Sequence, residues 1–217
     1  MYGKLLTICA HPDDDVLGAG AILSLLSTTC EIHTIYLSNG VGSREATEED
    51  EVEARLDAMV KANEIMGIKE WEVGLFEDQR FDQYPIIELT KWVEQFVRDF
   101  KPDTILTHSP ADLNRDHRLT FEAVWTACRP LPESTVKQIY SFEVPSATEW
   151  GLDTFKPNVY LMGRFDKKAE AMKAYTTEMP ESPHPRSVAV MWNRACVRGS
   201  ECGKIVAEAF ELQRMVL

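Results

Sequence analysis

The chain has 217 residues, of which 44% are hydrophobic and 27% are charged, and its formal net charge is −12. This length and composition suit a soluble protein with one large α/β domain. The acidic charge, with no basic patch, disfavours binding to nucleic-acid backbones or anionic membrane surfaces. Five scattered cysteines, no leader-like segment and no apolar stretch of membrane-spanning length predict a cytoplasmic protein with free thiols.

Strand-like and helix-like segments alternate along the first two thirds of the chain. Apolar runs predict strands over residues 4–10, 31–37, 71–76, 104–107 and 139–144. Helical spacing of apolar residues predicts helices over 16–26, 48–66, 86–100 and 117–128. This alternation predicts an α/β fold with a mostly parallel sheet and helices on both faces. In such sheets, sites form at the carboxyl ends of the strands.

The last third of the chain is less regular. Residues 159–162 predict a strand, 166–175 a helix, 179–187 a proline-broken loop and 203–214 a closing helix. Because no linker interrupts the sequence, we expect a single domain over 1–217. In that domain, the part from about residue 145 onward would complete the substrate pocket.

Histidines and carboxylates gather directly after the first and fourth predicted strands. The first group is His11, Asp13, Asp14 and Asp15, and the second is Asp112, Asn114, Asp116 and His117. Carboxylates this close repel one another unless a cation neutralises them or a reaction uses a tuned acid or base. Two histidines and one carboxylate are a common ligand set for catalytic zinc. Neighbouring aspartates cannot easily both point at one ion, so one would bind the metal and the other would face a water molecule bound to that metal.

These motifs resemble a known family. The segment Ala10-His11-Pro12-Asp13-Asp14, with a later Asp116-His117 before a helix, is similar to the zinc-dependent de-N-acetylases of the LmbE/PIG-L family. Further matching segments follow in family order, from about Lys4 to Arg129: Gly42-Ser43-Arg44-Glu45, Arg55, Ala62, Gly67-Ile68 and 74–78. The resemblance implies a Rossmann-like fold, bound Zn²⁺, and removal of an acetyl group from an N-acetylglucosamine-type sugar or sugar conjugate.

The resemblance also implies individual roles. His11, Asp14 and His117 would ligate zinc, Asp13 would be the general base, Asp116 would steer a ligand imidazole, Arg44 would contact substrate and Asp78 would line the pocket. Asp15 stands where the family often has glutamate, and it would support the cluster or cap the following helix. Arg44 alternatively pairs with the acids that follow it.

The main departure from the family pattern is Asn114. Many members have a histidine at this position, where it is thought to stabilise the oxyanion of the reaction. An amide can also donate to an oxyanion. His184, in a Pro-His-Pro loop, is the alternative donor. We interpret Asp112 as an Asx turn before Asn114, and His108 as the polar end of its strand.

Two other functions compete with deacetylation. Acidic residues after a first parallel strand also occur in Mg²⁺-dependent phosphotransfer or receiver-like modules, although histidines suit zinc better. The other hypothesis is a non-catalytic nucleotide binder, because Gly18-Ala19-Gly20-Ala21 resembles part of a dinucleotide-binding loop. This loop lacks the third glycine of that motif, and the nearby acids would repel a pyrophosphate. The expected partner is a small N-acetylated sugar or conjugate. The sequence is compatible with a homo-oligomer.

Overall fold

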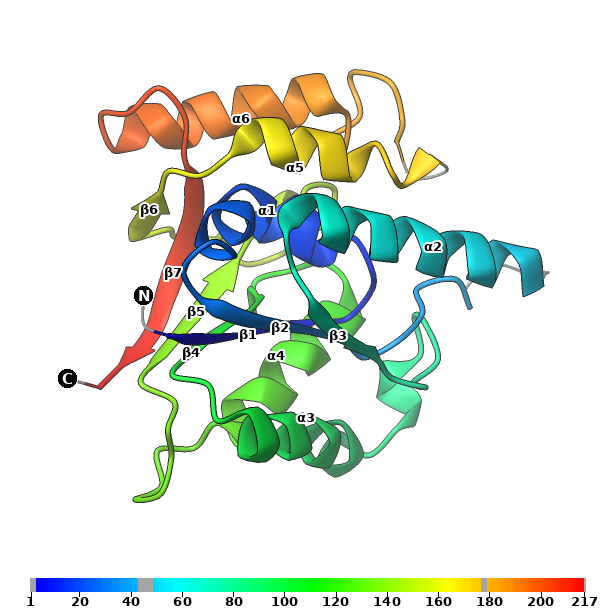
Figure 1. Cartoon of the computed structure of the whole chain (residues 1–217), viewed down its shortest axis with the longest axis vertical. Coiled ribbons are helices and arrows are strands. Elements are labelled where there is room, and N and C mark those ends of the chain that lie inside the picture. Colours follow the sequence, from blue (N-terminus) through cyan, green and yellow to red (C-terminus); the bar gives the residue numbers. More distant parts are fainter. Residues whose placement is uncertain (1–2, 43–48, 177–178, 217) are drawn as a thin grey trace.

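The computed structural model describes residues 3–42, 49–176 and 179–216. Its centre is a seven-stranded sheet in the order β3-β2-β1-β4-β5-β7-β6 (Figure 1). The strands are β1 Lys4–Cys9, β2 Glu31–Tyr36, β3 Glu70–Val73, β4 Thr104–His108, β5 Gln138–Phe142, β6 Val159–Leu161 and β7 Glu208–Met215. Strands β1 to β5 pair in parallel, whereas β7 runs antiparallel to β5 and β6. The predicted α/β fold with a mostly parallel sheet is confirmed.

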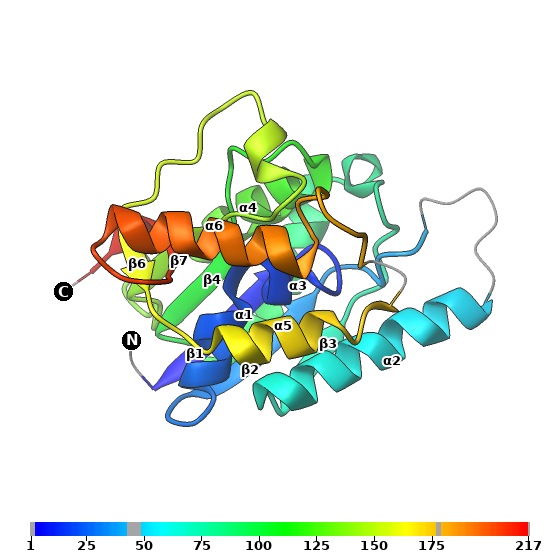
Figure 2. The same ribbon diagram turned by 90° about the horizontal axis from the view of Figure 1, so that it is seen from above.

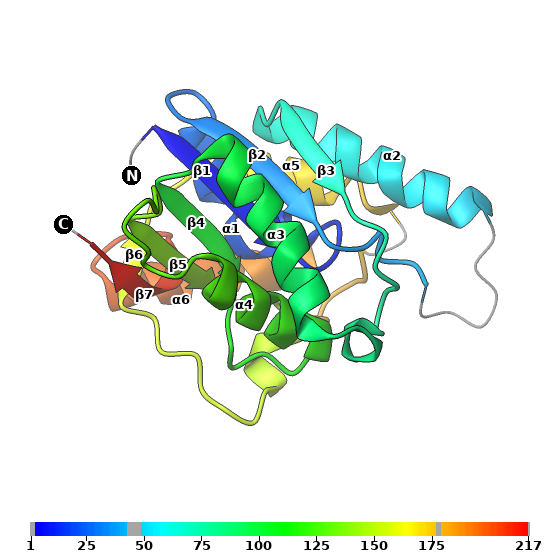
Figure 3. The same cartoon turned by 90° about the horizontal axis from the view of Figure 1, so that it is seen from below.

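Helices cover both faces of the sheet. They are α1 Asp14–Leu26, α2 Glu49–Met66, α3 Ile86–Phe100, α4 Arg115–Ala127, α5 Phe165–Met172 and α6 Val188–Glu201. The helices α1, α2, α5 and α6 lie on one face, and Figure 2 shows α5 between α2 and α6. The helices α3 and α4 lie side by side on the opposite face (Figure 3).

The alternation of side chains along β1 explains why the core has two halves. Leu5 and Cys9 point into the cluster under α1, α2 and α5, whereas Leu6 and Ile8 point into the cluster under α3 and α4. Successive side chains of a strand face opposite sides of the sheet, so a strand covered on both faces is apolar throughout. This is why the segment predicts a buried strand so clearly.

The side of the sheet to which new strands are added switches at β1. From β1 the chain winds outward through β2 to β3, and it then returns to place β4 on the other side of β1. The loops after β1 and β4 lie side by side and lead to helices on opposite faces of the sheet, and open α/β sheets form their binding crevice at such a switch in strand order. The two polar groups found in the sequence follow these two strands.

The end of the chain differs from its prediction. The predicted helix over 203–214 is wrong, because this segment forms β7, which is inserted between β5 and β6. Glu208, Glu211 and Arg214 are spaced by three and imitate a helical polar face, but Phe210 and Leu212 alternate into the core as in a strand. Helix α6 was not predicted; it starts after Ser187, whose hydroxyl accepts a hydrogen bond from the N–H of Val190.

Within the described ranges, none of the helices combines the length and the apolar character that crossing a membrane requires.

Candidate active site

The site lies where the loops after β1 and β4 meet. His11 comes two residues after the end of β1, and α1 begins at Asp14. After β4, Asn114 caps α4: its side-chain oxygen accepts from the N–H of Asp116 at 2.9 Å. The N–H of Asn114 in turn donates to Oδ1 of Asp112 at 2.8 Å, which is the predicted Asx turn. Because β1 and β4 are parallel neighbours, these loops bring residues about a hundred positions apart into contact.

Three buried side chains face one another at this junction. Nδ1 of His11 lies 3.3 Å from Oδ2 of Asp14 and 3.3 Å from Nε2 of His117. Nε2 of His117 lies 3.4 Å from Oδ1 of Asp14, and all three residues are at most 6% exposed. Two ring nitrogens that face each other beside a carboxylate require a proton or a cation between them. The donor set of His11, Asp14 and His117 therefore fits a metal ion, and two imidazoles with one carboxylate suit zinc.

The second nitrogen of each imidazole is held by carboxylates. Nε2 of His11 lies 3.1 Å from Oδ1 of Asp78 and 3.2 Å from Oδ2 of Asp116. Nδ1 of His117 lies 3.2 Å from Oδ2 of Asp112. Such contacts fix the tautomer and the direction of a metal-binding histidine. Asp116 thus contacts the imidazole of His11, and Asp112 contacts that of His117 in addition to forming a turn.

Asp78 and Asp116 join the loop after β3 to this cluster. Asp116 accepts hydrogen bonds from the backbone N–H groups of Gln79 at 2.7 Å and Phe81 at 3.2 Å. Asp78 is only 4% exposed. The structure therefore places Asp78 against His11, inside the cluster.

The carboxylates of the cluster favour the protonated, positively charged forms of His11 and His117. Burial alone would lower the pKa of His11, but its contacts with Asp116, Asp14 and Asp78 outweigh burial and hold the pKa well above its ordinary value. Burial opposes the charge of His117 as well, yet Asp14 and Asp112 raise its pKa to about 9. Burial would raise the pKa of Asp14, but the neighbouring histidines hold it well below its usual range. A metal ion would take the place of protons on these groups.

His108 packs against the cluster through its contact with His117. Its ring stacks on His117 with centroids 4.0 Å apart, and its Nε2 accepts the N–H of Ala10 at 2.9 Å. Burial and the neighbouring His117 lower the pKa of His108 to about 3, so this ring is neutral at ordinary pH. The interpretation of His108 as the polar end of its strand agrees with the hydrogen bond to Ala10, but missed the contact with His117.

The two other aspartates of the first motif have separate surroundings. Asp13 is the N-cap residue of α1, with φ of 108°, and its Oδ2 lies 3.1 Å from a nitrogen of both Arg55 and Arg186. Asp15 lies in the first turn of α1 and accepts a hydrogen bond from the Tyr36 hydroxyl at 2.8 Å. Burial raises the pKa of Asp15 to about 7. Asp15 is thus held by Tyr36, and the N-cap position that the sequence suggested for Asp15 belongs to Asp13.

The remaining predicted residues are less closely tied to the cluster. Arg44 lies outside the described residues. In the described part of the chain, the hydrogen bonds of His184 stay within its own loop, where its Nδ1 accepts the N–H of Arg186 at 3.2 Å. Arg186 itself reaches Asp13, a contact that sequence reasoning missed. A single arginine in a proline-rich loop carries no pattern that links it to a residue 173 positions away.

Comparison with known proteins identifies the family. Residues 6–128 match the family "GlcNAc-PI de-N-acetylase" (PIG-L). The chain belongs to this family. The match confirms the resemblance found in the motifs around His11 and His117, and it assigns the chain to a family of deacetylases.

Individual relatives are distant in sequence but similar in length and fold. A protein of Bacillus anthracis, "Probable N-acetyl-alpha-D-glucosaminyl L-malate deacetylase 2", is 25% identical over 80% of each chain. The N,N'-diacetylchitobiose deacetylase from Pyrococcus horikoshii has a TM-score of 0.80 at 19% identity, covering 97% of this chain and 84% of its own. The 4-carboxy-2-hydroxymuconate hydratase from Pseudomonas putida KT2440 has a TM-score of 0.76 at 20% identity, covering 100% and 98%. The two structures establish likeness of fold, and the hydratase shows that this fold also serves a different reaction.

Proposed function

We propose that this protein is a zinc-dependent hydrolase that removes the N-acetyl group of an N-acetylglucosamine-type sugar or sugar conjugate. The observation that carries the proposal is the buried group of His11, Asp14 and His117, with the buried Asp13 adjacent to Asp14 in the chain. Family membership supports the reaction class, and the names of the bacillary relative and of the chitobiose deacetylase support an acetylated amino sugar.

The proposed ligand atoms are Nδ1 of His11, a carboxylate oxygen of Asp14 and Nε2 of His117. When bound there, zinc would polarise the amide carbonyl and make a coordinated water more acidic. Asp78 and Asp116 hold the opposite nitrogen of His11, and Asp112 holds that of His117. These contacts present both imidazoles to the metal in one tautomer and one direction.

Asp13 is the proposed general base. It would take a proton from the attacking water and pass it to the leaving amine as the C–N bond breaks, so that acetate and a free amine result. Asn114 or His184 would donate a hydrogen bond to the carbonyl oxygen as negative charge develops on it. Arg44 is the proposed substrate contact, and the region from residue 145 onward is proposed to complete the pocket.

The test is release of acetate from a panel of N-acetylated sugars, nucleotide sugars and glycoconjugates by the zinc-loaded protein. We expect turnover of at least one amino-sugar derivative, loss of turnover with a chelator, and recovery when zinc is restored. Metal analysis of protein purified without chelator should find about one zinc per chain. Protein that holds no transition metal, or that releases no acetate from any member of the panel, would contradict the proposal.

A further inference from the structure

Two arginines from distant segments converge on one oxygen of Asp13. Nη2 of Arg55, from α2, and Nη1 of Arg186, from the loop before α6, each lie 3.1 Å from Oδ2 of Asp13. Asp13 is 1% exposed and Arg55 is 7% exposed, whereas the side chain of Arg186 is 21% exposed. Arg186 is therefore the partner that approaches Asp13 from the solvent side.

Arg186 makes two further contacts, one through its side chain and one through its backbone. Its Nε donates to the Ser146 hydroxyl at 2.7 Å, and its backbone N–H donates to Nδ1 of His184 at 3.2 Å. Ser146 belongs to the loop that follows β5. One guanidinium thus connects three segments: the loop after β1, the loop after β5 and the loop before α6.

Asp13 needs such external support because its backbone is strained. Its φ of 108° and ψ of −25° lie in a region that L-residues rarely adopt because of steric strain. The surrounding structure must therefore hold this residue in place. Two guanidiniums on the same carboxylate oxygen also restrict the rotation of the Asp13 carboxylate.

We propose that Arg186 is a positioning residue that orients the Asp13 carboxylate for proton transfer. The inference rests on the proposed function, because it takes Asp13 as the general base. A base must lie within hydrogen-bond reach of the proton that it removes, and a displacement of about 1 Å can reduce the rate about 100-fold. Arg186 acts through Asp13, so its loss reduces the rate of the chemical step and leaves substrate binding nearly intact.

Arginine is required at this position because the two side-chain contacts use different nitrogens of the guanidinium. Nε reaches Ser146 while Nη1 reaches Asp13. A lysine has one nitrogen at the end of a flexible chain, so it keeps the charge but does not hold both partners in a fixed geometry.

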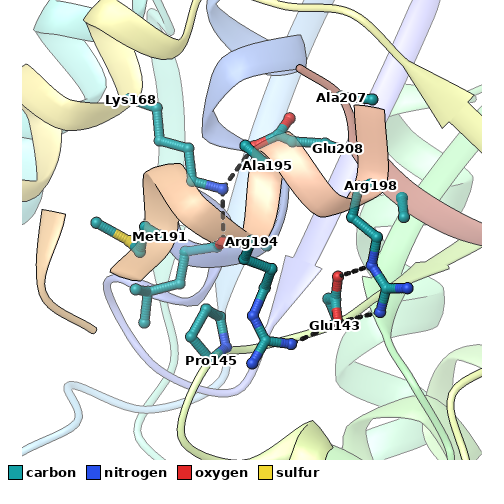
Figure 4. A pocket seen from close by; sticks show the side chains of 12 residues that line it. Glu143, Pro145, Lys168, Met191, Arg194, Ala195, Arg198, Ala207 and Glu208 are labelled. Atoms are coloured by element: carbon teal, nitrogen blue, oxygen red, sulfur yellow. Dashed lines mark hydrogen bonds and ion pairs between the residues drawn. The ribbon is translucent and has the colours of Figure 1, made fainter. Parts of the chain in front are cut away.

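The experiment compares Arg186→Ala and Arg186→Lys with a matched control, Arg198→Lys. Arg198 has a 17% exposed side chain and binds Glu143 through two nitrogens at 2.8 Å (Figure 4), but it contributes nothing to the proposed chemistry. We expect both Arg186 variants to lose roughly 10- to 100-fold in kcat, with KM within about twofold and the zinc content unchanged. Arg198→Lys should keep the wild-type kcat even where its melting temperature falls.

Two further measurements separate positioning from a general structural role. A guanidinium salt at concentrations that do not denature the protein should restore part of the kcat of Arg186→Ala, but none of that of Asp13→Asn. Ser146→Ala should lower kcat in the wild-type background and have little further effect in Arg186→Ala, because both changes release the same carboxylate.

The outcomes are distinct. An active wild type with equal kcat in Arg186→Ala overturns this inference alone, and so does a rise in KM without loss of kcat. The inference is also overturned if Arg198→Lys loses as much kcat as Arg186→Lys. A wild-type protein that releases no acetate overturns the proposed function, and this inference with it.

Discussion

Oδ2 of Asp112 lies 3.2 Å from Nδ1 of His117 and accepts a hydrogen bond from the Thr148 hydroxyl at 2.7 Å. This pairing turns Nε2 of His117 toward Asp14 and His11. Burial would raise the pKa of Asp112, but His117 and the Thr148 hydroxyl outweigh burial and lower it, so Asp112 stays ionised. A buried, ionised carboxylate behind the imidazole would make His117 a stronger ligand for a metal ion.

We therefore expect Asp112→Asn to weaken zinc binding by about 10- to 100-fold. Asparagine keeps the oxygen that accepts the N–H of Asn114, so the turn survives and only the charge behind His117 is lost. The measurement is competition for zinc against a chromogenic chelator. Asp99→Asn, at an exposed aspartate on α3, is the control and should leave the affinity unchanged. Equal zinc affinity in the wild type and Asp112→Asn would refute the role assigned to this contact.

Replacing Asp13 separates the chemical step from metal binding. Asp13→Asn keeps the shape of the side chain but cannot take up the proton, so we expect turnover to fall by about 10²- to 10⁴-fold. Zinc content should not change, because Asp14 and not Asp13 faces the two histidines. Acetate release and metal analysis on the same preparation check both points. Asp13→Asn with the wild-type rate would rule out Asp13 as the base.

The sequence predicted the elements that carry local periodicity. Helix α3 spans Ile86–Phe100 as its apolar spacing indicates, and α4 begins two residues before its predicted start because Asn114 caps it. Strand β7 was missed because its pairing with β5 and β6 is non-local, while its charged residues imitate a helix.

For the site, the sequence predicted the residues of the two motifs but not the contacts around them. The motifs around His11 and His117 led to the three residues that the structure brings together, because each follows a strand and both strands end at the same edge of the sheet. The contacts that complete the site were not predictable in this way. Asp112 reaches His117 through the geometry of a turn, and Arg186 reaches Asp13 across 173 positions from a loop without periodicity.

Glu143 should make the stability of the protein depend on pH in acid. It accepts from Nη1 of Arg194 and from Nε and Nη2 of Arg198, each at 2.8 Å (Figure 4). Burial would raise the pKa of Glu143, but Arg198 and Arg194 outweigh burial and lower it from its ordinary 4.5. Because the folded pKa is the lower one, the contribution of Glu143 is complete above about pH 4.5 and is lost as the pH falls through the folded pKa.

Glu143→Gln should consequently lower the free energy of unfolding at pH 7 by about 1.5–3 kcal/mol. The difference from the wild type should narrow as the pH is lowered below the ordinary pKa of glutamate. Urea unfolding at a series of pH values measures this. Glu31→Gln, which removes an exposed pair with Lys4, should change stability by less than about 1 kcal/mol at every pH. A difference for Glu143→Gln that is the same at all pH values would contradict the assigned cause.

Gly18→Ala tests how tightly α1 is packed behind the site. A Cβ at Gly18 would lie 2.2 Å from Cδ2 of Phe142, a fully buried ring that also contacts His108, with ring centroids 5.2 Å apart. Alanine gains about 1 kcal/mol in helix propensity over glycine. Overpacking a filled core costs about 1–3 kcal/mol, and a ring wedged between α1 and His108 has little room to move. We therefore expect net destabilisation, measured by urea unfolding, together with weaker zinc binding as Phe142 presses on His108 and His117.

Two control variants accompany Gly18→Ala. Gly3→Ala, where a Cβ meets nothing within 4 Å, should be neutral, and Phe142→Leu should recover part of the loss in Gly18→Ala. Stabilisation by Gly18→Ala would mean that the helix can shift away from Phe142 and that this packing does not hold the site in place.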